Sequence, residues 1–247
     1  MTNNYRDKIY EKYSTVFQGK DAALTFDTAS ADAQAEVLEK RFAAHLPTDK
    51  NAAIAELACG GGNFLYFLKS RGYTNLTGID ISPQQVALAR QVIPQVEEGN
   101  LIAFLEKNPE RFDLITAFDL IEHLTKDEVL SFIEKAYTAL KPEGKLLLQT
   151  PNGDSPFVGT VLYGDFTHEI CLNPASISKL LKLCGFADIA CHEMGPVVHG
   201  FVSWIRRLLW WKVRLMLKFI HLIETGSAGS GIFTRVFYVV ALKRENS

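Results

Sequence analysis

Short apolar runs alternate with helix-forming stretches between residues 52 and 150, and this alternation restricts the possible folds more than any other feature. Five runs have the length of a buried strand and end at glycine, proline or polar residues. They are 52–58, 75–81, 95–99, 111–120 and 144–150. Because parallel strands need crossovers of helix length, the pattern predicts right-handed βαβ units and a sheet covered by helices on both faces.

The segments before and after this region do not show the alternation of strands and helices. Residues 1–46 are predicted to form an N-terminal helical cap, and residues 47–247 an α/β domain. A long loop rich in glycine, proline and polar residues is expected at 151–173. Further along, a strongly amphipathic helix at about 200–224 is inserted before a final strand at 232–242.

The overall composition limits the function classes. The 247 residues are 47% hydrophobic and 22% charged, with a net charge of −2 and an isoelectric point near 6.3. Because the chain has no excess of basic residues, binding to nucleic acid is not expected. The four cysteines form no CxxC pair, the N-terminus does not resemble a secretory signal, and no uncharged apolar stretch reaches 18 residues. These features favour a cytoplasmic protein without a membrane-spanning helix.

The stretch "AELACGGGNF" at 55–64 indicates a tight turn where the first strand meets the following helix. Ligands of open parallel sheets bind at this turn. A dinucleotide fingerprint would require a third glycine at the position of Leu65, and a carboxylate such as Glu56 would repel a pyrophosphate. Asp80 ends the second strand, 20 residues after Gly60, where an acidic side chain accepts hydrogen bonds from ribose hydroxyls. Together these residues predict a site for a nucleoside with a cationic, phosphate-free tail.

Four stretches in order, "IAELACGGGNFL", "LTGIDISPQQVALAR", "FDLITAFDLIEHL" and "GKLLLQTPN", resemble the class I S-adenosylmethionine-dependent methyltransferases. The resemblance covers about residues 50–190. It implies a Rossmann-like α/β fold with seven strands, mostly parallel, of which the last is antiparallel. It also implies S-adenosylmethionine as the cofactor and methyl transfer as the reaction.

The resemblance further implies which residues hold the cofactor, with the methionine at the glycine turn and the adenosine at the end of the second strand. They would be Glu56, Ala58, Cys59, Gly60, Gly62, Asp80, Ile81, Asn100 and Asp119. Two of these depart from the family pattern. Ala58 stands where glycine is common, and Asn100, expected near the adenine edge, stands where aspartate is common.

The stretch "AFDLIEHL" raises the question of a metal. Asp119, Glu122 and His123 have the spacing i, i+3, i+4, which one helical turn would place on one face. Two carboxylates and an imidazole can bind a divalent cation. The same Glu-His step resembles the quinone-biosynthesis O-methyltransferases, some of which are metal-assisted, but it also occurs in related methyltransferases without a metal. We therefore expect no metal and keep this set as the alternative.

A second polar cluster lies in "YGDFTHEICLN". Methyl transfer to a hydroxyl benefits from a base with a pKa near ambient pH, and histidine suits this role. His168 is the expected base, with Asp165 or Glu169 orienting it and His123 in reserve, whereas loop bracing is the alternative role for Asp165 and His168. The residues expected to contact the acceptor are Tyr13, Glu122, Asn152 and Glu169.

The loop after "TPN" resembles a bacterial branch of the family that is associated with cell-surface polysaccharide biosynthesis. This resemblance implies an oxygen of a small carbohydrate or nucleotide-linked acceptor. One alternative is a phenolic quinone precursor, methylated with a divalent metal. Another is an inactive subunit that binds S-adenosylmethionine for a partner protein.

The helix at 200–224 has apolar residues along one side, interrupted only by Lys212, and Arg207, Arg214, Lys218 and His221 on the other. Its position before the last strand favours a lid over the substrate. A basic amphipathic helix with tryptophans can also lie on an anionic membrane, which would place the protein at the inner membrane face. The sequence leaves the oligomeric state open.

Overall fold

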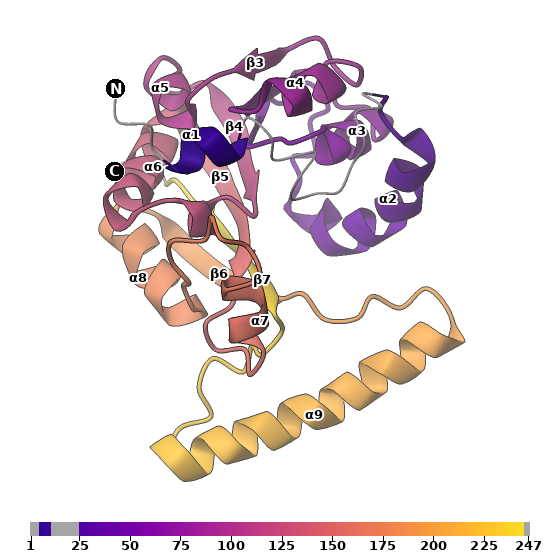
Figure 1. Ribbon diagram of the computed structural model, residues 1–247, viewed down its shortest axis with the longest axis vertical. Coiled ribbons are helices and arrows are strands. Elements are labelled where there is room, and N and C mark those ends of the chain that lie inside the picture. The colour runs from indigo at the N-terminus through magenta and orange to yellow at the C-terminus, as the bar shows by residue number, and fades with distance from the viewer. Residues whose placement is uncertain (1–4, 11–24, 245–247) are drawn as a thin grey trace.

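A computed structural model describes residues 5–10 and 25–244, and its centre is a seven-stranded sheet (Figure 1). The strands lie in the order β3-β2-β1-β4-β5-β7-β6, and β7 runs antiparallel to both of its neighbours. This confirms the predicted fold class. The strands are β1 (Ile54–Leu57), β2 (Leu76–Asp80), β3 (Val96–Glu98), β4 (Phe112–Phe118), β5 (Leu140–Pro151), β6 (Ala187–Glu193) and β7 (Val236–Leu242).

Helices cover both faces of the sheet and produce two separate hydrophobic cores. One face carries α2 (Thr28–Phe42), α3 (Asn63–Ser70) and α4 (Pro83–Ala89). The other carries α5 (Leu101–Glu106), α6 (Lys126–Ala139) and α8 (Pro174–Leu183). The remaining helices are α1 (Tyr5–Tyr10), α7 (Val158–Leu162), α9 (Phe201–Thr225) and the 3-10 turns Ala43–His45 and Ile121–His123.

Local sequence fixes several helix starts. Thr125 and Glu128 form a reciprocal capping box at the start of α6, which satisfies two backbone N–H groups that have no partner within the helix. The α2 helix begins at Thr28, because the side chain of Asp27 accepts a hydrogen bond from the backbone N–H of Ser30.

The described parts of the predicted N-terminal cap lie at two different places. The α2 helix packs on α3, where the rings of Phe42 and Phe64 meet edge to face with centroids 5.8 Å apart. The short α1 helix instead lies beside α6, to which Arg6 is held by an ion pair with Glu128 at 2.8 Å.

The α9 helix lies apart from both layers, at the bottom of Figure 1, and is joined to the sheet by two linkers at 194–200 and 226–235. Ser203 is the one buried residue of this helix, all of which is described. Among the helices of residues 5–10 and 25–244, none has a stretch both long and apolar enough to cross a membrane.

The strand order determines where a ligand can bind. From β1 the chain moves outward through β2 and β3, and then returns to add β4 and β5 on the opposite side of β1. The carboxyl ends of β1 and β4 therefore border the crevice at which open α/β sheets bind their ligands.

Candidate cofactor and acceptor site

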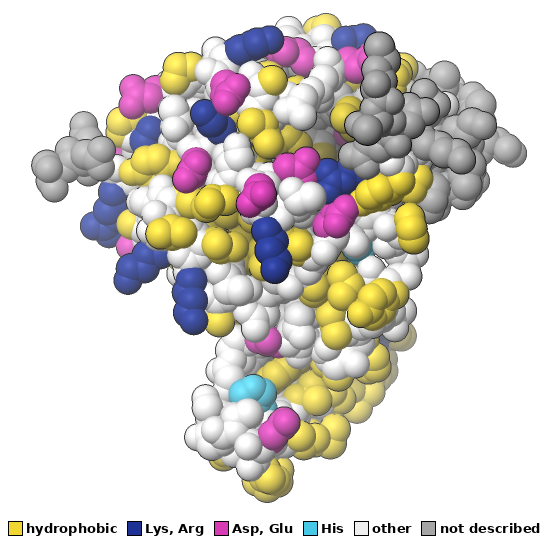
Figure 2. Space-filling model, turned by 60° about the vertical axis from the view of Figure 1, so that its left-hand side comes forward, with side chains coloured by type: hydrophobic (Ala, Val, Ile, Leu, Met, Phe, Trp, Pro, Cys, Tyr) yellow, Lys and Arg dark blue, Asp and Glu magenta, His cyan; other side chains and the backbone are white. Residues whose placement is uncertain are grey.

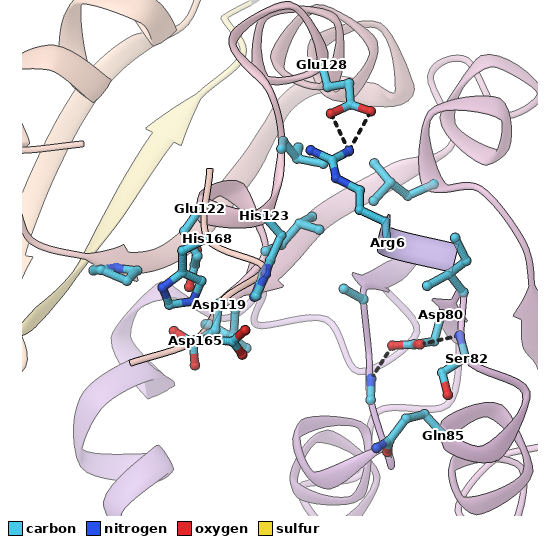
Figure 3. Close-up of a pocket in the computed structure, with 18 of the residues that line it drawn as sticks. Arg6, Asp80, Ser82, Gln85, Asp119, Glu122, His123, Glu128, Asp165 and His168 are labelled. Carbon is cyan, nitrogen blue, oxygen red and sulfur yellow. Dashed lines mark hydrogen bonds and ion pairs between the residues drawn. The ribbon is translucent and has the colours of Figure 1, made fainter. Parts of the chain in front are cut away.

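A pocket of about 800 Å³ opens at the carboxyl ends of these strands (Figure 3). This volume lies within the usual range for small-molecule sites. One half is formed by the glycine turn and the end of β2, and the other by the residues after β4 and by the loop after α7. Of the residues predicted for the site, the pocket lining contains Ala58, Gly60, Asp80, Ile81, Asn100, Asp119, Glu122, His123, Asp165 and His168.

The glycine turn and the carboxylate of Asp80 hold one another in place. Gly60 has a φ of +51°, which favours glycine, and its backbone N–H donates to Asp80 Oδ2 at 2.8 Å. The backbone N–H of Ser82 donates to the other oxygen, also at 2.8 Å. Burial raises the pKa of Asp80, and these backbone hydrogen bonds act against that rise. Each carboxylate oxygen can still accept a further hydrogen bond, as the paired hydroxyls of a ribose require.

Two buried polar atoms near this turn have no partner among the described residues, namely Glu56 Oε2 and Ser82 Oγ. The carboxyl group of Glu56 is only 4% exposed, and burial raises its pKa well above the ordinary value of 4.5. A cation beside it would favour the ionised form and satisfy the free oxygen. The residues present therefore fit a ligand with an ammonium at one end and a ribose at the other.

Three residues predicted to hold the cofactor also have structural roles. The side chain of Cys59 is 5% exposed and packs in a hydrophobic core. A Cβ at Gly62 would lie 3.1 Å from the Cα of Ala89, so this glycine permits close packing of α3 on α4. Asn100 lines the pocket, but its side-chain oxygen caps α5 by accepting from two backbone N–H groups.

The predicted single face of Asp119, Glu122 and His123 is wrong. Asp119 has a φ of +50°, so the chain turns sharply before the 3-10 turn that carries the other two. Its Oδ1 accepts from the side-chain amide of Gln149 at 3.0 Å. In its place His168 joins the set: one ligand atom from each of Glu122, His123 and His168 lies within 4.8 Å of the other two.

Hydrogen bonds determine which nitrogen of His123 is available. Thr167 Oγ1 donates to Asp165 Oδ1 at 2.6 Å and lies 2.8 Å from His123 Nδ1. Because the hydroxyl has a single hydrogen, Nδ1 of His123 must be the donor to Thr167, which leaves a lone pair on Nε2. Burial and the nearby His168 together lower the pKa of His123 to about 4, so the ring is neutral at pH 7.

A hydrogen bond also determines which nitrogen of His168 carries the hydrogen. Its Nδ1 lies 3.1 Å from the carbonyl oxygen of Val161, which can only accept, so Nδ1 is again the donor. The rings of His168 and His123 meet edge to face with centroids 4.7 Å apart. The carboxylate of Asp165, predicted to orient His168, accepts a hydrogen bond from Thr167 and through it acts on His123.

Glu122 is the third member of the set. It is 2% exposed, and Thr150 Oγ1 donates to its Oε2 at 3.1 Å. Burial raises the pKa of Glu122 well above its ordinary value, and the nearby Asp119 adds to this rise. A buried carboxylate beside two imidazole nitrogens is a donor set that suits a divalent cation.

Asn152 and Glu169, also expected to contact the acceptor, are not among the residues that line the pocket. The amide of Asn152 is 0% exposed and donates to the backbone oxygens of Ile232 and Thr234, both at 2.9 Å, so it braces a loop. Glu169 accepts from Tyr5 and pairs with Arg6, so it anchors α1. Tyr13 lies outside the described residues.

Sequence reasoning missed Arg6 and Thr167. Arg6 lines the pocket and pairs with Glu128 at 2.8 Å and with Glu169 at 3.2 Å. Neither contact has a local signal, because both partners lie more than a hundred positions away. None of the described residues that line the pocket comes from α9, so in this structure the helix does not cover the pocket as the predicted lid would.

A protein-family model described as a methyltransferase domain matches residues 31–223. The chain belongs to this methyltransferase family. It is an S-adenosylmethionine-dependent methyltransferase, with S-adenosylmethionine as its cofactor. A solved S-adenosylmethionine-dependent methyltransferase from Archaeoglobus fulgidus has the same fold, with a TM-score of 0.63 and 18% identity over 85% of this chain and 94% of that one.

Relatives of known name correct the expected acceptor. A ubiquinone biosynthesis O-methyltransferase of Actinobacillus pleuropneumoniae is 29% identical over 177 residues, which are 60% of this methyltransferase and 72% of that protein. A protein of the same name from Pseudomonas putida is 32% identical over 107 residues, which are 40% of this chain and 44% of the relative. These names contradict the expected role in surface polysaccharide biosynthesis.

Proposed function

We propose that this methyltransferase transfers a methyl group to a phenolic oxygen of a quinone precursor, with a divalent cation held by Glu122, His123 and His168. The observation that carries the proposal is the convergence of these three side chains in one half of the pocket. This half, formed by the residues after β4 and by the loop after α7, is called the acceptor half below. The names of the relatives, ubiquinone biosynthesis O-methyltransferases, support the acceptor class.

The other half, formed by the glycine turn and the end of β2 and called the cofactor half, has to bind two groups of S-adenosylmethionine. Glu56 would receive the ammonium group of the methionine end, and Asp80 the ribose hydroxyls. When bound, S-adenosylmethionine supplies an electrophilic methyl group on a sulfonium. Much of the rate enhancement would then come from holding the acceptor oxygen in line with that methyl group.

The acceptor half has to favour the ionised phenol. Glu122 and the two Nε2 lone pairs would hold the cation, whose charge lowers the pKa of a nearby hydroxyl. Thr167 and the carbonyl of Val161 keep each ring in the tautomer that leaves Nε2 free. Asp165 completes this support by accepting from Thr167.

The test is methyl transfer to an ortho-dihydroxyphenyl acceptor with a short isoprenoid tail, followed by mass spectrometry. We expect a monomethylated product, loss of activity on chelation, and recovery when Mg²⁺ or Mn²⁺ is added back. His168→Ala should lower kcat/KM about 100-fold or more, whereas the control His199→Ala, an exposed histidine outside the pocket lining, should not change it.

Two outcomes would contradict the proposal in distinguishable ways. If S-adenosylmethionine binds but no phenolic acceptor is methylated, the acceptor class is wrong. If methylation proceeds fully after chelation while His168→Ala is inactive, the cation is wrong and His168 acts as the base.

A further inference from the structure

The α9 helix presents large apolar side chains to solvent along its whole length. It has 25 residues, and the exposed fractions of its large apolar side chains reach 74% at Phe201, 62% at Phe219 and 71% at Ile223. Figure 2 shows hydrophobic side chains gathered over the lower part of the molecule, where α9 lies. An exposed apolar surface of this extent marks an interface with another molecule or with a membrane.

The apolar surface is wide. At 100° per residue, the exposed apolar side chains occupy about 200° of the helix circumference. The seam of a two-stranded coiled coil is narrower, because it uses only the a and d positions. The wide face consists of Phe201, Val202, Trp204, Leu208, Leu209, Trp211, Val213, Leu215, Met216, Phe219, Ile220, Leu222 and Ile223.

The opposite side of α9 is polar and faces the rest of the protein. Arg214 pairs with Glu193 at 2.5 Å, and the indole N–H of Trp210 donates to the same carboxylate at 3.4 Å. Further along, the Nδ1 of His221 lies 2.7 Å from the backbone oxygen of Ser227. These contacts direct the apolar side of the helix away from the protein.

The charge of α9 differs from that of the whole chain. The helix carries five basic residues, Arg206, Arg207, Lys212, Arg214 and Lys218, and one acidic residue, Glu224. The complete chain has a net charge of −2. Arg206, Arg207 and Lys218 flank the apolar face, whereas Lys212 lies within it and Arg214 is paired with Glu193. Basic residues flanking an apolar face with exposed tryptophans complement the surface of an anionic bilayer, and the long side chain of a lysine within that face can extend its ammonium group to the headgroups.

We propose that α9 lies in the interface of an anionic membrane, with its apolar face in the acyl boundary and its basic residues at the level of the headgroups. The width of the apolar face and the surplus of positive charge favour a bilayer over a second copy of this chain, since two α9 helices would bring their positive charges together. This proposal concerns a different part of the protein from the acceptor site, and it depends only on the observations made on α9.

Hydrogen bonds connect α9 to the wall of the pocket. The linker that follows the helix is fixed to the loop before α7, because Ser230 donates to Asp154 at 2.9 Å and Asn152 donates to the linker backbone. That loop leads into Thr160 and Val161, which line the pocket. The same segment exposes Phe157, Tyr163 and Phe166 at 55%, 84% and 75%. A docked α9 would therefore keep this wall of the pocket close to the lipid.

Flotation of the full-length protein with vesicles tests the proposal. We expect the wild type to float with mixtures of phosphatidylcholine and phosphatidylglycerol, and much less with phosphatidylcholine alone. Replacing Leu209, Met216 and Phe219 by serine should abolish flotation. Arg206→Gln and Arg207→Gln should each weaken binding to the anionic vesicles about fivefold.

A matched control separates docking from folding. Leu183→Ser removes a leucine of α8 that is 73% exposed, and it should float like the wild type. Binding of S-adenosylmethionine, measured by calorimetry, should be equal in all variants, so a failure of the acceptor assignment would not affect this readout. The proposal is overturned if the wild type does not float with anionic vesicles, or if the serine variant floats equally well. A wild-type dimer that binds no vesicles and dissociates in the serine variant would instead identify a second copy as the occupant.

Discussion

The pocket and α9 show two opposite ways in which side chains of one chain are used. In the pocket, polar groups such as Glu122 and His123 are buried and held by hydrogen bonds from neighbouring elements. On α9, apolar groups are exposed and make few contacts with the rest of the protein. In each region the unfavourable placement supports the partner that we propose: a small charged ligand in the first, and a lipid surface in the second.

The largest effect is expected from removing the buried charge of the acceptor half. Glu122→Gln keeps the size of the side chain and a hydrogen bond with Thr150, but it removes the charged cation ligand. We expect kcat/KM for a phenolic acceptor to fall about 10²- to 10³-fold. Glu134→Gln on α6 is the matched control, because Glu134 is exposed and should be neutral. Equal activity of both variants would mean that Glu122 has only a packing role.

The next effect concerns the cofactor half. Glu56→Gln should raise the dissociation constant for S-adenosylmethionine about 10- to 100-fold, because a charge-assisted contact with the ammonium group is lost. Isothermal titration calorimetry measures this directly. An unchanged dissociation constant would show that Glu56 does not contact the cofactor.

The same carboxyl group predicts a pH dependence. Burial raises the pKa of Glu56 in the free protein, whereas a bound ammonium group favours the ionised form. Binding should therefore release a proton, and affinity should rise with pH until the raised pKa of the free protein is passed. Titrations in two buffers of different ionisation enthalpy measure the proton release, which should be absent in Glu56→Gln.

A smaller effect is expected from the support of His123. Thr167→Val removes the hydroxyl that fixes the ring tautomer, and the affinity for Mn²⁺ alone should fall about tenfold. Thr167→Ser should restore it, because the hydroxyl returns. Thr138→Val, an exposed threonine on α6, serves as the control. If valine and serine at position 167 give the same Mn²⁺ affinity, the hydrogen-bonded relay has no part in cation binding.

The smallest effect on stability is expected from α9. Replacing Leu209, Met216 and Phe219 by serine should change the free energy of unfolding by no more than about 0.5 kcal/mol per site, because all three are exposed. Leu147→Ala, at a site in the sheet with 0% exposure, should cost about 2–5 kcal/mol. Urea unfolding compares the two. A large loss in the serine variant would mean that α9 packs on the protein in solution.

Most of the fold could be predicted from the sequence, because the strands of the parallel sheet are short apolar runs between helices. The glycine turn and Asp80 were also predictable, since their spacing reflects a local strand-turn-helix unit. The turn at Asp119 was not, because its positive φ breaks the helical period on which the prediction depended. The pairing of Arg6 with Glu128 joins distant segments, and no local pattern reports it.

The α9 helix shows a second limit of sequence patterns. Its amphipathic period predicted a helix with one apolar and one basic side. The same period is typical of a helix that covers a core and of one that lies on a membrane. Only the arrangement in space distinguishes them, because it places the polar side of α9 against Glu193 and leaves the apolar side uncovered.

Anomalous diffraction from crystals grown with Mn²⁺ and S-adenosylhomocysteine tests the central claim most directly. The account predicts one anomalous peak bonded to the carboxylate of Glu122 and to a ring nitrogen of both His123 and His168, with the amino group of the cofactor product at Glu56. A cofactor product bound at Glu56 and Asp80 with no anomalous peak between these three side chains would contradict it.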